Sequence, residues 1–167
     1  MPDYRRFRHA GHSYFFTVAL ADRTGTTLTD EVCAFRDAWR RTQAERPFTC
    51  PALVILPDHL HAIWTLPDDD SDFPTRWQVI KARFTHALNV RPARSDSKAR
   101  RRERGIWQRR YFERMIRDEA QMRAAVAYCW TNPVRHGLVQ RPVDWPHSSF
   151  HDAVAAGDVP PDWTGWS

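Results

Sequence analysis

Two short apolar segments separated by a turn constrain the fold of this chain more than any other stretch. They span residues 49–56 and 59–66, and a Pro-Asp turn lies between them. Each segment has the length and composition of a β-strand, which predicts two neighbouring strands. Side chains alternate between the two faces of a strand, so His59 and His61 lie on one face. Two imidazoles on one face can bind a divalent metal ion, although one of them could instead hydrogen-bond a backbone carbonyl.

Strands and helices are predicted to alternate around these two segments. The strands are rich in aromatic and β-branched residues, and the helices carry apolar residues at helical spacing. The other predicted elements are a strand at 14–20, a helix from Thr29 or Asp30 to about Glu45, a helix from about Thr75 to Leu88, a strand in the second half of 106–116 and a helix at 118–132. The second of these helices has Arg76, Lys81 and Arg83 outside its apolar stripe.

The order of these elements predicts the fold class. A β-α-β-β-α-β order is typical of an α+β fold with a ferredoxin-like split β-α-β antiparallel sheet and helices on one face. The additional C-terminal helix at 118–132, which carries a tyrosine, must then lie against the sheet or its edge.

This C-terminal helix offers two groups that could complete a site with the histidines. Tyr128 and Asn132 are four residues apart and share one helix face. The amide oxygen of Asn132 is a hard donor suited to Mg²⁺ or Mn²⁺. Pro133 is expected to end the helix and to leave Asn132 at its end, since a residue before proline avoids the α region. Tyr128 could also be no more than a partly buried packing residue.

Composition and charge limit the class of protein. The chain has 167 residues, which predicts a single domain over 1–167 with a basic loop at 91–105 and a C-terminal tail at 140–167. Its net charge of +5 favours a polyanionic partner. The three cysteines form no CxxC pair, which argues against a disulfide framework and for a reducing compartment. No apolar run reaches the roughly 18 residues of a membrane span, so we expect a soluble, cytoplasmic protein with no membrane partner.

Arginines cluster in two regions of the sequence. One is the N-terminal segment, and the other runs from the basic loop to Arg110 and includes Trp107. Aromatic rings interleaved with arginines suit nucleic acid, although such a run can also be a solvated loop.

The chain resembles the REP-associated tyrosine transposases, a bacterial group within the single-tyrosine HUH transposases. The resemblance runs over nearly the whole chain and rests on several motifs together. They include Tyr4-Arg5-Arg6, Leu56-Pro57-Asp58-His59-Leu60-His61, Ile80-Lys81-Ala82-Arg83-Phe84, Ile106-Trp107-Gln108-Arg109-Arg110, Asn132-Pro133-Val134-Arg135-His136-Gly137 and Asp144-Trp145-Pro146-His147-Ser148-Ser149-Phe150. The chain departs from the family pattern at Ala127, where an acidic residue is frequent, and at Trp130-Thr131.

The resemblance implies a role for each of these groups. His59 and His61 would be metal ligands, Asn132 the third ligand of Mg²⁺ or Mn²⁺, and Tyr128 the nucleophile. Attack by the tyrosine on single-stranded DNA would leave a 5′-phosphotyrosine and a free 3′-hydroxyl, which gives nicking and strand transfer. The implied partner is a single-stranded DNA hairpin with a short tetranucleotide at its base, and the implied setting is the nucleoid. A monomer is favoured and a dimer is possible.

A larger set of residues is predicted to contact the DNA. These residues share positive charge, aromatic rings or a place in the motifs above: Tyr4, Arg5, Arg6, Arg8, Lys81, Arg100, Arg101, Arg102, Arg104, Trp107, Arg109, Arg110 and Ser149. The tail at 145–150 could read the tetranucleotide or could pack its Trp and Phe against the core.

Two other functions remain open from the sequence. One is a non-catalytic nucleic-acid-binding module, with RNA as a possible partner. The other is a metal-dependent hydrolase that uses water. Neither of them needs Tyr128 as a reacting group.

Overall fold

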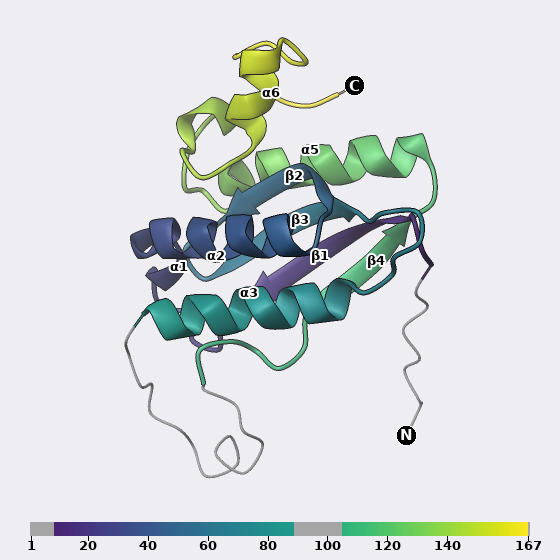
Figure 1. The fold of residues 1–167 in the computed structure, drawn as a ribbon. Helices are drawn as coiled ribbons and strands as arrows, with labels where there is room; N and C mark the ends of the chain where they lie inside the picture. The colour runs from purple at the N-terminus through teal and green to yellow at the C-terminus, as the bar shows by residue number, and fades with distance from the viewer. Residues whose placement is uncertain (1–8, 89–104, 167) are drawn as a thin grey trace, which may run out of the picture.

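A computed structural model describes residues 9–88 and 105–166 of the chain (Figure 1). Its elements follow in the order β1 (Ser13–Ala19), α1 (Thr27–Asp30), α2 (Val32–Glu45), β2 (Thr49–Ile55), β3 (His59–Thr65), α3 (Phe73–Ala87), β4 (Phe112–Ile116), α5 (Glu119–Arg135), the 3-10 turn η1 (Pro142–Asp144) and α6 (Phe150–Ala156). Within the two described ranges, no helix has both the length and the apolar character needed to cross a bilayer.

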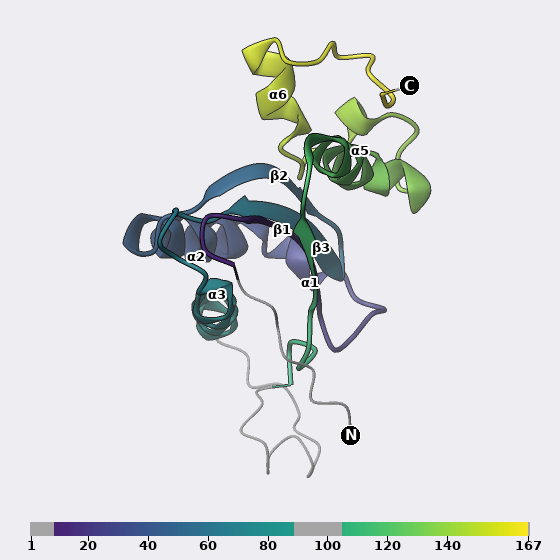
Figure 2. The same ribbon diagram turned by 90° about the vertical axis from the view of Figure 1, so that its right-hand side faces the viewer.

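The four strands form one antiparallel sheet in the order β2-β3-β1-β4. The two central strands, β1 and β3, are therefore distant in sequence, as the ferredoxin-like split requires. Helices α2 and α3 cover one face of the sheet, and α5 lies against the other (Figure 2). The predicted α+β class and ferredoxin-like topology are confirmed, and the additional helix lies on the face opposite the other two.

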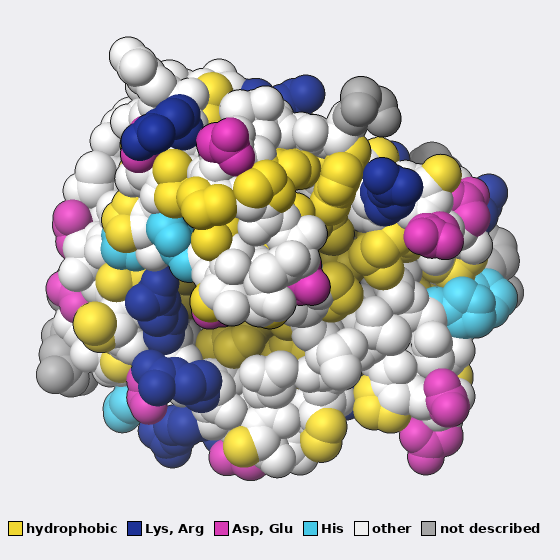
Figure 3. Space-filling view, turned by 90° about the horizontal axis from the view of Figure 1, so that it is seen from above, with side chains coloured by type: hydrophobic (Ala, Val, Ile, Leu, Met, Phe, Trp, Pro, Cys, Tyr) yellow, Lys and Arg dark blue, Asp and Glu magenta, His cyan; other side chains and the backbone are white. Residues whose placement is uncertain are grey.

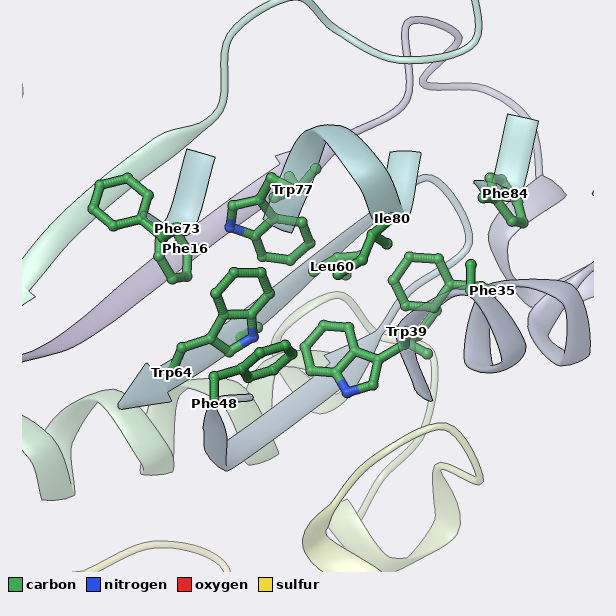
Figure 4. Packing of buried hydrophobic residues seen from close by; sticks show 14 of the residues in the cluster. Phe16, Phe35, Trp39, Phe48, Leu60, Trp64, Phe73, Trp77, Ile80 and Phe84 are labelled. Atoms are coloured by element: carbon green, nitrogen blue, oxygen red, sulfur yellow. The ribbon is translucent and has the colours of Figure 1, made fainter. Parts of the chain in front are cut away.

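The face under α2 and α3 is closed by aromatic side chains. Alternation along β1 and β3 turns Phe16 and Trp64 to this side, and both are fully buried. Trp64 stacks on Trp77 of α3 with ring centroids 4.2 Å apart and an interplanar angle of 14° (Figure 4). Because a slip of one residue would turn these rings to the other face, their burial fixes the strand register.

One charged side chain is buried at the start of α3. Arg76 is only 3% exposed and donates hydrogen bonds to the carbonyls of Arg46 (3.0 Å) and Pro47 (2.8 Å). It also pairs with a carboxylate oxygen of Asp70 at 2.6 Å. The arginine therefore ties α3 to the chain that leads into β2, although its sequence position outside the apolar stripe suggests a surface residue.

The opposite face of the sheet is covered by α5 and the C-terminal tail. Trp130 of α5 and Phe150 of α6 are buried in this layer, with their rings 5.5 Å apart. Residues 147–149 run along the outer edge of β2, where the His147 carbonyl accepts from the Ile55 N–H and the Leu53 carbonyl accepts from the Ser149 N–H. Hydrophobic side chains gather around a hollow on this side of the molecule (Figure 3).

Two predicted helix boundaries are wrong. Pro133 does not end the C-terminal helix but lies inside α5, which continues to Arg135. Proline has no backbone N–H, so the helix loses only one hydrogen bond there. The next turn is still closed, because the His136 N–H donates to the Asn132 carbonyl at 3.0 Å. The helix stops at Gly137, whose φ of 68° suits glycine. The first predicted helix is divided at Glu31 into α1 and α2.

Candidate catalytic and metal site

The site begins with the two histidines at the start of β3. His59 and His61 point toward α5, and their exposed fractions are 5% and 4%. Their ring centroids are 5.0 Å apart and the planes are nearly perpendicular, at 83°. Alternation along the strand thus places both imidazoles on one face, as the sequence predicts.

One nitrogen of each imidazole is held by a neighbouring side chain. The Nδ1 of His61 lies 2.9 Å from Oγ1 of Thr17 on β1, and the Nδ1 of His59 lies 2.7 Å from Oδ1 of Asp58. Arg23 in turn donates to the other oxygen of Asp58. Partners of this kind fix ring orientation in metal sites and leave the Nε2 atoms for a ligand.

Helix α5 brings Tyr128 and Asn132 to the same place. The Tyr128 ring centroid is 5.1 Å from that of His61, and the two rings meet edge to face. Asn132 is only 1% exposed, whereas Tyr128 is 39% exposed at the rim. The four predicted residues therefore lie together, although Asn132 is inside the helix rather than at its end.

Two buried polar atoms in this cluster have no hydrogen-bond partner among the described residues. They are Nε2 of His61 and Oδ1 of Asn132. Leaving such atoms buried and unpaired is costly, and native proteins usually pair them with protein, water or an ion. Their chemistry, an imidazole nitrogen and an amide oxygen, fits a divalent cation.

The electrostatics keep both imidazoles in the form that binds metal. Burial, followed by the neighbouring His59 and His136, lowers the pKa of His61 to about 3. Burial also lowers the pKa of His59, against the opposing effect of Asp58. The neutral imidazole is the form that binds a metal ion, so both rings are ready to do so at neutral pH.

His136 is a member of this cluster that the sequence prediction missed. Its ring centroid lies 5.1 Å from that of His59. His136 follows Asn132 by four residues, as Asn132 follows Tyr128. This spacing could have indicated that all three side chains lie on one face of the helix. In the described parts of the chain, no three His, Cys, Asp or Glu side chains are arranged to hold a metal ion, so His136 does not make a three-histidine centre.

Arg135 is a second neighbour that the sequence prediction left out. Its guanidinium carbon lies 5.2 Å from the centroid of the Tyr128 ring. A cation over the ring face is attracted by the ring quadrupole. The tyrosine therefore has an aromatic edge contact on one side and a positive charge on another.

The predicted DNA-contacting residues are spread over several parts of the structure. Trp107 is half-buried on the α2 and α3 side, and the Lys81 amine lies 5.6 Å from its ring centroid, so these two are not part of the histidine cluster. Arg109 and Arg110 are exposed and follow the segment that pairs with the end of β1. Residues Tyr4, Arg5, Arg6, Arg8, Arg100, Arg101, Arg102 and Arg104 lie outside the described residues.

Ser149 has a structural position. Its Oγ accepts hydrogen bonds from the Leu53 N–H at 2.9 Å and from the Trp130 indole N–H at 3.0 Å. Trp145 also donates its indole N–H to the Ile55 carbonyl at 2.9 Å. Trp145 and Phe150 in the tail thus pack against the β2 side of the molecule, which was one of the two expectations for this segment.

Comparison with known proteins identifies the family. The chain is 42% identical over 165 residues to a REP-associated tyrosine transposase of Escherichia coli K12, covering 99% of this chain and 92% of that protein. A protein of Haemophilus influenzae assigned to the same family is 43% identical over 167 residues and is covered to 94%. The chain belongs to the REP-associated tyrosine transposases.

A solved structure from the REP-associated tyrosine transposases has the same fold. It is a REP-associated tyrosine transposase bound to a REP hairpin, with a TM-score of 0.88, 42% identity, and coverage of 99% of this chain and 93% of that one. No family model matches the chain. In the present chain, the candidate site lies between the sheet and α5. It consists of His59, His61, Tyr128 and Asn132.

Proposed function

We propose that this transposase nicks single-stranded DNA at REP-type palindromic hairpins and transfers the strand through a 5′-phosphotyrosine. The observation that carries the proposal is the position of Tyr128 beside a nitrogen of His61 and an oxygen of Asn132 that are buried, have no partner among the described residues and could bind a cation. A packing tyrosine or a module that only binds DNA has no need of such a cluster. The hairpin as substrate is taken from the related structure, which is bound to a REP hairpin.

Tyr128 would act as the nucleophile. Its hydroxyl oxygen forms a bond to phosphorus while the bond from phosphorus to the 3′ oxygen breaks. The tyrosine gives up its hydroxyl proton and the leaving 3′ oxygen gains one, so the step is balanced. Its partial exposure of 39% leaves room for a DNA strand at the rim.

His59, His61 and Asn132 would hold a divalent cation, Mg²⁺ or Mn²⁺. When bound, such an ion polarises the non-bridging phosphate oxygens and stabilises charge on the leaving oxygen. Thr17 and Asp58 keep the two imidazoles oriented through their Nδ1 atoms. Arg135, next to the tyrosine ring, adds positive charge where a phosphate would approach.

The covalent intermediate would allow the strand to be transferred. A phosphotyrosine bond keeps the energy of the original phosphodiester, so a 3′-hydroxyl can attack it and release the tyrosine without a nucleotide cofactor. The 3′-hydroxyl can come from the same strand or from another. The first choice reseals the nick, and the second joins new DNA.

A covalent adduct assay tests the proposal. The full-length protein is incubated with a labelled single-stranded REP-type hairpin and Mg²⁺ or Mn²⁺, and the products are separated on a denaturing gel. The wild type is expected to give an adduct, and Tyr128→Phe is expected to lower its yield at least about a thousandfold while hairpin affinity changes less than about threefold. Phenylalanine keeps the ring that packs on His61 and Phe15, so the variant is a matched control for structure.

The same assay separates the competing functions. If the wild type cleaves the DNA without forming an adduct, and Tyr128→Phe still cleaves it, the protein is a hydrolase that uses water. Binding with no cleavage by the wild type would mean a nucleic-acid-binding module. His59→Ala is expected to lose metal-dependent cleavage, and undiminished activity in excess chelator would contradict the metal assignment.

A further inference from the structure

A pocket next to Tyr128 extends from the histidine cluster toward the outer strand of the sheet. It has a volume of about 420 Å³ and lies between the β4 edge of the sheet and α5. Its lining residues are Phe15, Thr17, Phe112, Arg114, Ala124, Ala125 and Tyr128. This volume lies within the range of about 300–1,000 Å³ that is usual for ligand pockets.

The pocket is open because one wall is an edge strand and the other is a helix face with small residues. Phe112 and Arg114 of β4 pair with Thr17 and Phe15 of β1, so their side chains lie on the α5 side of the sheet. Ala124 and Ala125 face them from α5 and leave space where larger side chains would fill the gap. The edge position of β4 leaves the entrance open to solvent.

Phe112 is the most exposed large hydrophobic side chain in the described part of the molecule, at 56%. Among the described residues its ring contacts one aromatic neighbour, Phe15, edge to face at 6.3 Å. An aromatic ring with a free face at a pocket entrance is suited to stacking against a planar ligand. Burial in the core does not account for this residue.

Arg114 gives the pocket a positive charge. No carboxylate in the two described ranges forms an ion pair with it, and its guanidinium carbon lies 6.0 Å from the Phe15 ring centroid. A guanidinium group can stack on a base or bind a phosphate. The chemistry of the pocket therefore matches an unpaired nucleotide, which has both a flat base and an anionic group.

The pocket is continuous with the site through two residues. Tyr128 lines it directly, and Thr17 lines it while bonding Nδ1 of His61. A phosphate at the Tyr128 hydroxyl would place the adjoining nucleotide at the pocket entrance. We infer that the pocket between Phe112, Arg114 and α5 binds the unpaired base next to the phosphate that Tyr128 attacks. This inference rests on the proposed function. It means that the base in the pocket is not paired in a duplex.

Photochemical cross-linking tests the pocket without requiring cleavage. A hairpin oligonucleotide with single-stranded flanks carries 5-iododeoxyuridine at one flank position at a time. The full-length protein is irradiated with each oligonucleotide and the linked peptide is found by mass spectrometry. One position is expected to cross-link to Phe112, and Phe112→Ala is expected to lower the yield at least fivefold. A set of cross-links that all lie elsewhere, or equal yields in both proteins, would overturn the inference.

A matched variant controls for loss of an exposed aromatic ring. Trp166 is 38% exposed and lies near Arg123, whose guanidinium carbon is 5.5 Å from the indole ring. Trp166→Ala is expected to leave the cross-link yield unchanged. Phe112→Ala is expected to fold normally, because more than half of the side chain is already in solvent.

Kinetics with an abasic nucleotide supply a second test. An abasic site next to the attacked phosphate and the Phe112→Ala change are each expected to lower the rate of adduct formation about tenfold. Together they are expected to lower it no further, since both remove the same stacking contact. Phe112→Trp should stay within about threefold of the wild type. If the abasic site and Phe112→Ala together lower the rate of adduct formation about a hundredfold, their effects are independent and the base does not lie against Phe112.

The two proposals fail in different ways. If the wild type forms no adduct, the proposed chemistry is wrong, while the cross-link still decides what the pocket binds. If the adduct forms normally in Phe112→Ala with every oligonucleotide, only the pocket assignment is wrong. A dimer that Phe112→Ala dissociates in light scattering, without any cross-link, would mean that a second copy covers the pocket and would also overturn the inference.

Discussion

The two faces of the sheet are built for different purposes. The face under α2 and α3 is closed by aromatic rings that are almost completely buried, such as Trp64 and Trp77. The face under α5 holds imidazoles, an amide and a half-exposed tyrosine. Period-two alternation along β3 turns Trp64 to the first face and both imidazoles to the second, and helices α3 and α5 supply the other side chains.

Buried polar groups show the difference most clearly. Arg76, next to the aromatic face, donates to two carbonyls and pairs with Asp70. On the other face, Nε2 of His61 and Oδ1 of Asn132 have no partner among the residues that the structure describes. The aromatic face also has two buried indole nitrogens without a partner among the described residues, those of Trp64 and Trp77. An indole nitrogen is a donor only and cannot bind a cation, whereas the imidazole nitrogen of His61 and the amide oxygen of Asn132 can. Both faces thus contribute a hydrophobic core, and the α5 face alone carries the candidate metal ligands.

The largest effect on the free energy of unfolding is expected for Trp64→Ala. The change removes a fully buried ring that stacks on Trp77 at 4.2 Å and should cost about 4 kcal/mol. Urea denaturation followed by circular dichroism measures it. A loss below about 1 kcal/mol would mean that the aromatic face is not the main source of stability.

Arg76→Ala is expected to have the next largest effect, about 3 kcal/mol. It leaves the carbonyls of Arg46 and Pro47 and the carboxylate of Asp70 without their donor. The same urea experiment applies. Arg41→Ala is the matched control, because that arginine is exposed and its pair with Asp37 is long at 3.9 Å, so the change should cost less than about 0.5 kcal/mol.

A pH effect from His61 is expected to be smaller, about 2 kcal/mol between pH 7.5 and 5. Burial lowers the pKa of His61 from its ordinary value of 6.5 to about 3. Between these values the unfolded chain binds a proton that the folded chain does not, so the protein loses stability as the pH falls below about 6.5.

The pH effect is measured from urea midpoints in chelator, with His61→Gln for comparison. The wild type is expected to lose more stability than the variant over this range, because the variant lacks the titrating group. Parallel curves for the two proteins would contradict the prediction.

The smallest effect on stability is expected for Asn132→Ala, below about 1 kcal/mol, because its buried amide oxygen has no well-formed hydrogen bond within the described residues. Adduct formation should nevertheless fall about a hundredfold. Asn132→Asp, which keeps an oxygen donor, should retain more activity in excess Mn²⁺. Large losses of stability in both variants would remove the contrast between the two faces.

Local patterns in the sequence predicted much of this arrangement. Alternation placed His59 and His61 on one face, and helical spacing placed Tyr128 with Asn132. The fold followed from the order of the elements. These inferences needed only contacts within one element or between neighbouring ones.

The features that the sequence did not reveal depend on contacts between distant segments. Pro133 was expected to end α5, but packing of α5 against β2 outweighs one missing hydrogen bond. The burial of Arg76 depends on carbonyls about 30 residues away. The partner of His61, Thr17, is 44 residues away on β1. No periodicity in one segment can indicate such partners.

The outer edge of β2 has a consequence for how the chain is made. Leu53 bonds the Oγ of Ser149, which follows it by 96 residues, and the Ile55 N–H bonds the His147 carbonyl. During synthesis the outer edge of β2 therefore remains unpaired until the whole sheet and α5 have left the ribosome. An unpaired edge can join another chain, so folding with the tail last leaves this strand open to aggregation for the longest time.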